Sequence, residues 1–242
     1  MTRPQRSFVL GLSVLAGALL SAACGSVPEE QVLRQYFTAS RMRDNVTLGN
    51  IATVSFDPNE RGSIQSFDIV SVGMEEKRPL RVKELAAAEE AARLADEEFN
   101  KKKKEYQDAN LRAIERVVAA EQKRAALRGP DLAIQQAWTK WRDDSSEYAK
   151  KLSDARRALA EERNLATPSL ATVNPPVDPA TADGELLTKD VMVKADVRMP
   201  DGSTKPTDLR VRFTRADITG ATPATGKWII TEIADAAAAP QS

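Results

Sequence analysis

Between residues 85 and 166 the apolar positions recur at intervals that are typical of paired helices. Seven apolar or aromatic residues are spaced seven apart, and a neighbouring row is expected at Ala88, Ala95 and Ala109. The first row consists of Leu85, Ala92, Phe99, Tyr106, Ala113, Ala120 and Leu127. A sustained repeat of seven predicts a long helix with one face packed on a partner helix.

The partner helix is predicted to follow directly. Gly129 tolerates a left-handed helix cap and Pro130 cannot continue a hydrogen-bonded helix, so the first helix should end at residues 128–129. The second helix repeats apolar residues at intervals of three, four and seven. These are Ile134, Trp138, Trp141, Tyr148, Leu152, Ala155 and Leu159. Residues 81–166 are therefore expected to form an antiparallel hairpin with arms of about 65 Å and about 55 Å.

A second pattern, strict alternation, surrounds the hairpin. In residues 191–199 every second residue is apolar, while Lys194, Asp196 and Arg198 lie between them. Alternation of this kind predicts a half-buried strand. Further strands are expected at residues 63–74, 209–213 and 227–233, and a short amphipathic helix at residues 28–43. The predicted fold class is α+β, with a small antiparallel sheet, a packed N-terminal helix and a long inserted hairpin.

These elements divide the chain into segments. Residues 29–80 and 186–233 form the two parts of the α+β head, on either side of the hairpin. Residues 167–185 contain four prolines and are expected to be an extended linker. Residues 234–242 are expected to be a disordered tail.

The N-terminus has the pattern of an export signal. Arg3 and Arg6 precede an uninterrupted stretch without charges over residues 8–20, and the small residues 21–23 follow. A membrane-spanning helix needs about 20 apolar residues, so this stretch is too short to remain in the bilayer. Residues 1–23 are therefore predicted to be a signal peptide that is removed.

The residues LSAAC at positions 20–24 contain the only cysteine of the chain. This segment resembles the lipobox of bacterial lipoproteins, although Ser21 stands where Leu or Val is usual. The resemblance implies cleavage between Ala23 and Cys24, lipid on Cys24, and a short tether over residues 24–28. In this family an Asp after the cysteine often retains the protein on the inner membrane. Gly25 stands at that position here, so the outer membrane is favoured, with the mature protein on the periplasmic face. The alternative is an ordinary secretory signal cut after Ala23, which leaves a free thiol.

Composition excludes several kinds of function. Lys plus Arg and Asp plus Glu both number 35, so the formal charge is zero and nothing favours nucleic acid. The chain has no histidine and its one cysteine is expected to carry lipid. Ser–His and Cys–His catalysis and histidine-based metal sites are thereby excluded. We expect no enzyme activity, no cofactor and no metal.

The head has a helix followed by antiparallel strands that end in the segment GKWIITEI at residues 226–233. This order resembles the cystatin-like and NTF2-like folds over residues 29–80 and 186–233. The resemblance implies a curved sheet that binds a small molecule or a partner in its concave face. It carries over no functional residue.

Three functions fit these predictions. The favoured one is a non-enzymatic scaffold that contacts a protein partner through the projecting hairpin. There, Trp138 and Trp141 are either seam residues or, where exposed, a partner contact. The alternatives are a small-ligand-binding lipoprotein with a pocket in the head, and a periplasmic adaptor of an export system. Alanine-rich helix faces also leave homo-oligomerisation open.

Overall fold

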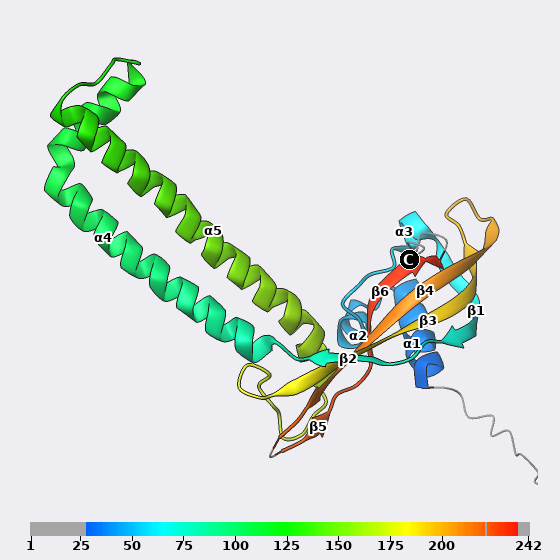
Figure 1. Cartoon of the computed structure of the whole chain (residues 1–242). Coiled ribbons are helices and arrows are strands. Elements are labelled where there is room, and N and C mark those ends of the chain that lie inside the picture. The colour runs from blue at the N-terminus through cyan, green and yellow to red at the C-terminus, as the bar shows by residue number, and fades with distance from the viewer. Residues whose placement is uncertain (1–27, 221, 237–242) are drawn as a thin grey trace, which may run out of the picture.

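Two long helices project from one side of a small head that combines helices with a curled antiparallel sheet (Figure 1). The computed structural model describes residues 28–220 and 222–236. The predicted α+β class is confirmed. The long helices leave and re-enter the head between strands β2 and β3, so the sheet pairs across the whole inserted hairpin.

The head begins with α1 (Pro28–Met42), the helix predicted from the amphipathic pattern. Glu29 and Glu30 lie in its first turn and Arg41 in its last, which suits the helix dipole. Two shorter helices follow, α2 (Asn45–Ile51) and α3 (Pro58–Arg61). Neither was predicted, because each is too short for an apolar repeat. The available signals were the N-cap residues Asp44 and Asp57, whose side chains accept backbone N–H groups.

The sheet is antiparallel and is centred on its two longest strands. On one side of β3 lie β1 and β2, one after the other, and on the far side of β4 lie β5 and β6. The bounds are β1 (Ser63–Val72), β2 (Glu76–Pro79), β3 (Gly184–Arg198), β4 (Thr204–Ile218), β5 (Ala224–Thr225) and β6 (Ile229–Asp235). The alternation predicted for residues 191–199 therefore belongs to a central strand.

The core of the head lies between α1 and one face of the sheet. Leu33, Tyr36 and Phe37 of α1 are buried against the alternating apolar side chains of β3 and β4. The strand residues are Val191, Val193, Ala195, Val197, Leu209, Val211 and Phe213. Tyr36 donates a hydrogen bond to Val54 O at 2.9 Å, and burial raises the pKa of its hydroxyl to about 12.

Three predicted segment limits need correction. The linker does not start at residue 167, because the second long helix, α5 (Pro130–Leu170), continues through Pro168. The last turn persists because Ser169 and Leu170 are buried in the head. The linker also ends earlier, because β3 starts at Gly184 and the second part of the head therefore begins before the predicted residue 186. The tail begins later than residue 234, because β6 continues to Asp235.

A buried ion pair fixes the start of α1 to the sheet. Lys189 Nζ of β3 lies 2.5 Å from Glu29 Oε1 and 3.3 Å from Glu75 Oε1. The same ammonium group lies 4.0 Å from the centre of the Trp228 ring. Lys189 and Glu29 are both buried, so each charge depends on the other for compensation. The helix that follows the N-terminal segment is thus fastened at its first turn.

Replacing only Lys189 should therefore destabilise the head. We expect Lys189→Met to lower the free energy of unfolding by about 3–5 kcal/mol, because it leaves the Glu29 carboxylate buried without its partner. The double variant Glu29→Gln/Lys189→Met should recover most of this loss. Urea unfolding of the two variants measures the difference, and equal losses would show that the pair does not act as a unit.

Candidate functional site: the helical hairpin and its base

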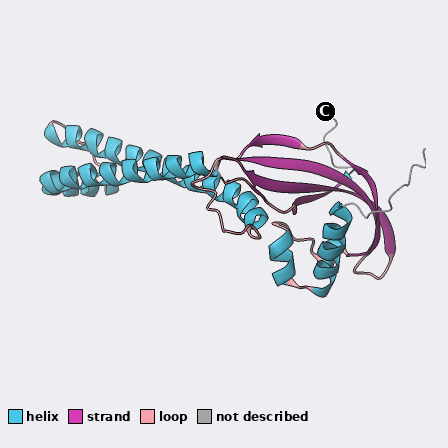
Figure 2. Ribbon diagram, turned by 90° about the horizontal axis from the view of Figure 1, so that it is seen from below, coloured by secondary structure: helices cyan, strands magenta, loops and turns pink. Residues whose placement is uncertain are grey.

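The hairpin is formed by α4 (Val82–Gln122) and α5, which lie side by side and project from the head (Figures 1 and 2). As predicted, every residue of the two main apolar rows is buried or half-buried. The seam is richest in aromatic contacts near its middle. Phe99 stacks on Tyr148 with ring centres 4.6 Å apart, and Trp141 lies 5.3 Å from Phe99 and 5.5 Å from Tyr106.

The structure places both tryptophans of α5 in this seam. Trp141 packs between Phe99 and Tyr106, and Trp138 is half-buried with Lys103 Nζ 5.8 Å from its ring centre. A paired aromatic docking surface required at least one exposed tryptophan, and neither is exposed. The two side chains hold the helices together.

The predicted second row of α4 was wrong. Ala88, Ala95 and Ala109 are exposed. The second row instead starts at Val82 and repeats every seven positions; its two valines are buried and the four polar residues between them are half-buried. It consists of Val82, Glu89, Asp96, Lys103, Asn110 and Val117. A search for apolar residues overlooks this row because most of its members are polar. The interval of seven counted from Val82 is the signal that could have identified it.

Polar members of the second row pair across the hairpin. Arg156 Nε donates to Glu89 Oε1 at 3.1 Å, and Lys103 Nζ donates to Ser145 Oγ at 3.0 Å. Each pair can form at only one alignment of the two helices. These contacts therefore specify the register of the seam more than they stabilise it.

The tip departs from a simple hairpin. The backbone of α4 bends at Asn110, which has φ −119° and ψ 16°, and its final turns cross the beginning of α5. There Arg116 Nη2 lies 2.8 Å from Asp131 Oδ1, and Arg142 Nη2 lies 3.1 Å from Glu121 Oε1. The outgoing arm is thus not a straight rod of about 65 Å, since its straight part, residues 82–109, spans about 42 Å.

The outgoing helix also ends earlier than predicted, at Gln122 and not at residues 128–129. Arg124 adopts a left-handed backbone with φ +53°, and Ala125 N–H bonds to Ala120 O at 3.0 Å. This geometry is a left-handed helix cap formed by an arginine. The prediction placed the cap at Gly129 because glycine is the usual residue in this conformation. Gly129, with φ +57°, instead precedes the first turn of α5. Residues 123–129 form an exposed loop at the tip.

Glu162 anchors the hairpin to the head. It lies seven residues after Ala155, at a position of the α5 seam that favours an apolar residue, yet its side chain is only 8% exposed. Arg78 of β2 makes a two-pronged pair with it, with N–O distances of 2.7 and 2.8 Å. The backbone N–H of Arg81, just before α4, donates to Glu162 Oε1 at 3.0 Å. One carboxylate thus ties α5 to the sheet and to the start of α4.

The last turn of α5 is joined to the sheet through Ser169. Its hydroxyl donates to Lys227 O at 2.7 Å and accepts the N–H of Ala216 at 2.9 Å. Gly226 makes this approach possible, because a Cβ there would lie 2.4 Å from both Ser169 Oγ and Ala216 O. The end of α5 therefore cannot slide along the sheet without breaking these contacts.

An apolar cluster completes the base of the hairpin. It joins the long helices to the sheet at the end where β3 begins and β4 ends. Its buried members are Leu80, Val82, Leu159, Ala166, Leu170, Leu186, Ala216 and Ile218. Because residues 159–170 of α5 belong to this base, the projecting part is residues 130–158. It spans about 44 Å, less than the length of about 55 Å predicted for this arm.

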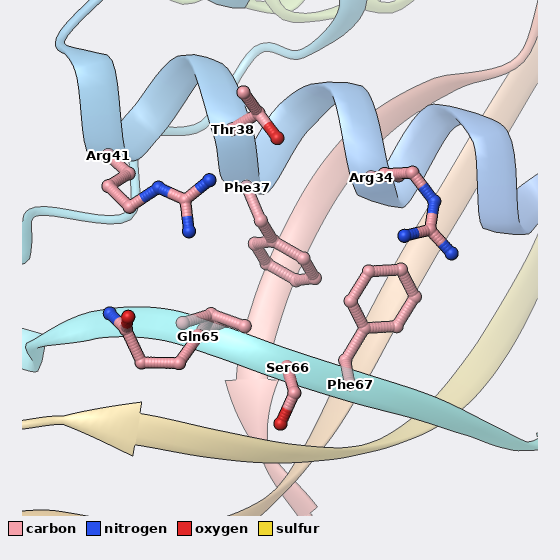
Figure 3. A pocket seen from close by; sticks show the side chains of 8 residues that line it. Arg34, Phe37, Thr38, Arg41, Gln65, Ser66 and Phe67 are labelled. Atoms are coloured by element: carbon pink, nitrogen blue, oxygen red, sulfur yellow. The ribbon is translucent and has the colours of Figure 1, made fainter.

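The head itself offers a shallow groove between α1 and the edge strand β1. Phe37 and Phe67 form its floor, and Arg34 and Arg41 point toward β1 on either side of Phe37 (Figure 3). Arg34 is engaged by Glu30 at 2.6 Å. Among the described residues that line the groove there is no carboxylate, imidazole or thiol, so it has no acid–base pair.

The predicted lipid site at Cys24 and the cleavage position after Ala23 lie outside the described residues. None of the described helices combines the length with the apolar character that a membrane span needs. No group of acidic, histidine or cysteine side chains there could hold a metal ion. Comparisons with protein-family models, with curated proteins and with solved structures give no match to this chain.

The base should weaken in acid. Burial alone would raise the pKa of Glu162, but the hydrogen bonds from Arg78 and from Arg81 N–H outweigh it and hold the pKa below its usual value of 4.5. A lowered pKa means that the carboxylate stabilises the fold fully above pH 4.5, and that this contribution is lost as the pH falls through the lowered value.

We therefore expect Glu162→Gln to lower the free energy of unfolding near neutral pH by about 2 kcal/mol. This is less than for a fully buried pair, because the Arg78 side chain is 41% exposed. The difference from the natural protein should shrink in acid. Glu147→Gln, at an exposed position of α5, is the matched control. A difference that is the same in acid and at neutral pH would contradict the assigned role of Glu162.

Proposed function

We propose that this protein is a lipid-anchored, non-enzymatic scaffold of the cell envelope, which presents a protein-binding surface on its hairpin. The observation that carries the proposal is the construction of the base. Glu162 and Ser169 are bonded into the head, whereas the outer part of the hairpin projects free of it (Figure 1). A helix pair that is fixed at one end and solvated along its length suits contact at a distance.

The address of the proposed scaffold comes from the N-terminal sequence. Lipid on Cys24 would hold the protein at the periplasmic face, and Gly25 favours the outer membrane. Each buried methylene contributes about 0.8 kcal/mol, so several acyl chains anchor a protein stably where one binds only marginally. No part of this anchor requires the head to cross the bilayer.

The tip of the hairpin is a better candidate for the partner contact than the two seam tryptophans. The loop of residues 123–129 carries Lys123, Arg124 and Arg128, all exposed, and contains no acidic residue. Leu111, in α4 just after the bend, and Leu132, in the first turn of α5, are also exposed. A tip that carries both cations and exposed apolar side chains favours a partner with an acidic and partly apolar surface, because charge complementarity steers association and fixes orientation. We place the partner contact at this tip.

The first alternative, a ligand pocket in the head, has less support. The space between α1 and the sheet is occupied by Leu33, Tyr36 and Phe213, all fully buried. For the second alternative, an export-system adaptor, no feature of the described residues adds to the presence of a hairpin. The scaffold is therefore the single function that we propose.

The direct test compares cross-linked partners in cells. In the shortened variant, residues 90–155 are replaced by a short Gly-Ser linker, which keeps the Glu89–Arg156 pair and the whole base. We expect this variant to fold, to reach the membrane and to lose a specific cross-linked protein that the full-length chain captures. Recovery of the same partners by both chains would contradict the proposal.

A finer variant tests the tip without changing the hairpin length. The triple change Lys123→Glu, Arg124→Glu and Arg128→Glu should reduce capture of the same partner at least about tenfold, since it reverses the complementary charge. The matched control reverses three exposed cations on the shaft, Lys101, Lys104 and Lys150. Equal effects of the two sets on quantitative cross-linking would show that the tip has no special role.

A further inference from the structure

The most exposed large apolar side chain among the described residues lies close to the start of α1. Met74, in the loop between β1 and β2, is 91% exposed. Val70 and Val72, at the end of β1, are exposed as well. Burying apolar side chains in the core does not account for three exposed ones at the end of a single strand. A group of exposed apolar residues often marks a surface that contacts another protein or a membrane.

The loop that carries Met74 is tied to the first turn of α1. Lys189 Nζ binds Glu75 Oε1, next to Met74, and also Glu29 Oε1. Gly73 N–H donates to Asp190 O at 2.8 Å, which holds the other side of the loop to β3. Met74 is therefore fixed near the residue at which the described chain begins, Pro28.

The N-terminal sequence brings this region close to a bilayer. Cys24 precedes Pro28 by four residues, and four residues span at most about 14 Å. The lipid on Cys24 would therefore hold the bilayer within this distance of the first turn of α1. This step rests on the proposed lipid anchor.

We propose that the loop of residues 73–75 and the end of β1 form a membrane-contacting surface, with the Met74 side chain inserted into the boundary between lipid headgroups and acyl chains. Methionine suits this position because its unbranched side chain adapts to an irregular apolar environment. The nearby Glu75 carboxylate lies 3.3 Å from the Lys189 ammonium group, which it shares with Glu29, so its charge is offset only in part.

This contact also orients the hairpin. In Figures 1 and 2 the long helices leave the head on the side away from the start of α1. With that start and Met74 on the bilayer, the tip points away from the membrane. The head then acts as a footing, held by lipid and by the loop, and the hairpin extends into the periplasm.

The single cysteine of the chain makes a clean test available. With lipid on Cys24, Met74→Cys introduces one free thiol, to which a polarity-sensitive fluorophore is attached. The full-length lipidated protein is reconstituted into vesicles of phosphatidylethanolamine and phosphatidylglycerol, and vesicle-bound protein is isolated by flotation. We expect the fluorophore at position 74 to emit several-fold more brightly, and at shorter wavelength, than the same dye free in buffer. Nitroxides carried on the lipids should quench this emission.

Ser203→Cys, in the turn between β3 and β4, and Ala125→Cys, at the tip, are the matched controls, and both should report water. Emission from position 74 equal to that from position 203 on floated protein would overturn the membrane contact and leave the lipid anchor intact. Protein that does not float would overturn the anchor and, with it, the contact. Because Met74 is exposed, its replacement should not impair folding.

Discussion

The arrangement of the whole molecule depends on one buried carboxylate, Glu162. A hairpin inserted between two strands keeps a fixed direction relative to the sheet only if its two ends are bonded to each other and to the sheet. Glu162 makes both connections, to Arg78 in β2 and to the backbone of Arg81 at the start of α4. Ser169 then fixes the end of α5 to β4, and the apolar cluster excludes water from the joint.

The hairpin beyond this joint follows a different physical principle. Its aromatic row, centred on Phe99, Tyr148 and Trp141, supplies the apolar burial that keeps two long helices together. Its polar row supplies alignment through Glu89 and Lys103. Partly solvated pairs of this kind stabilise little, so the outer hairpin should open more easily than the base. Such a gradient of stability is compatible with a tip that adapts to a partner.

Sequence periodicity predicted the parts of the fold that are long and repetitive. The heptad row from Leu85 and the alternation from Val191 led directly to the hairpin and to a central strand, because a single burial rule governs many consecutive residues there. The short helices α2 and α3 escaped prediction because they depend on single caps. The bend at Asn110 and the left-handed Arg124 also escaped, since each depends on local tertiary packing at the tip.

The candidate site was predicted only in outline. The sequence indicated a projecting hairpin, but it gave no sign that Glu162 anchors the base. A buried charge cannot be recognised without its partner, and Arg78 is distant in the sequence. Likewise Met74 appeared as the end of a strand, and its place beside α1 emerges only through Lys189. Both residues gain their meaning from contacts between distant segments.

The central claim, that the hairpin works by reach, is tested most directly by shortening it without altering the tip or the base. Removing residues 92–98 and 149–155 deletes one heptad from each arm in register, keeps the Phe99–Tyr148 and Glu89–Arg156 contacts, and shortens the reach by about 10 Å. The measurement is in-cell cross-linking of this variant beside the full-length chain. The account predicts a folded, membrane-bound protein that loses its partner, and undiminished capture of the same partner would contradict it.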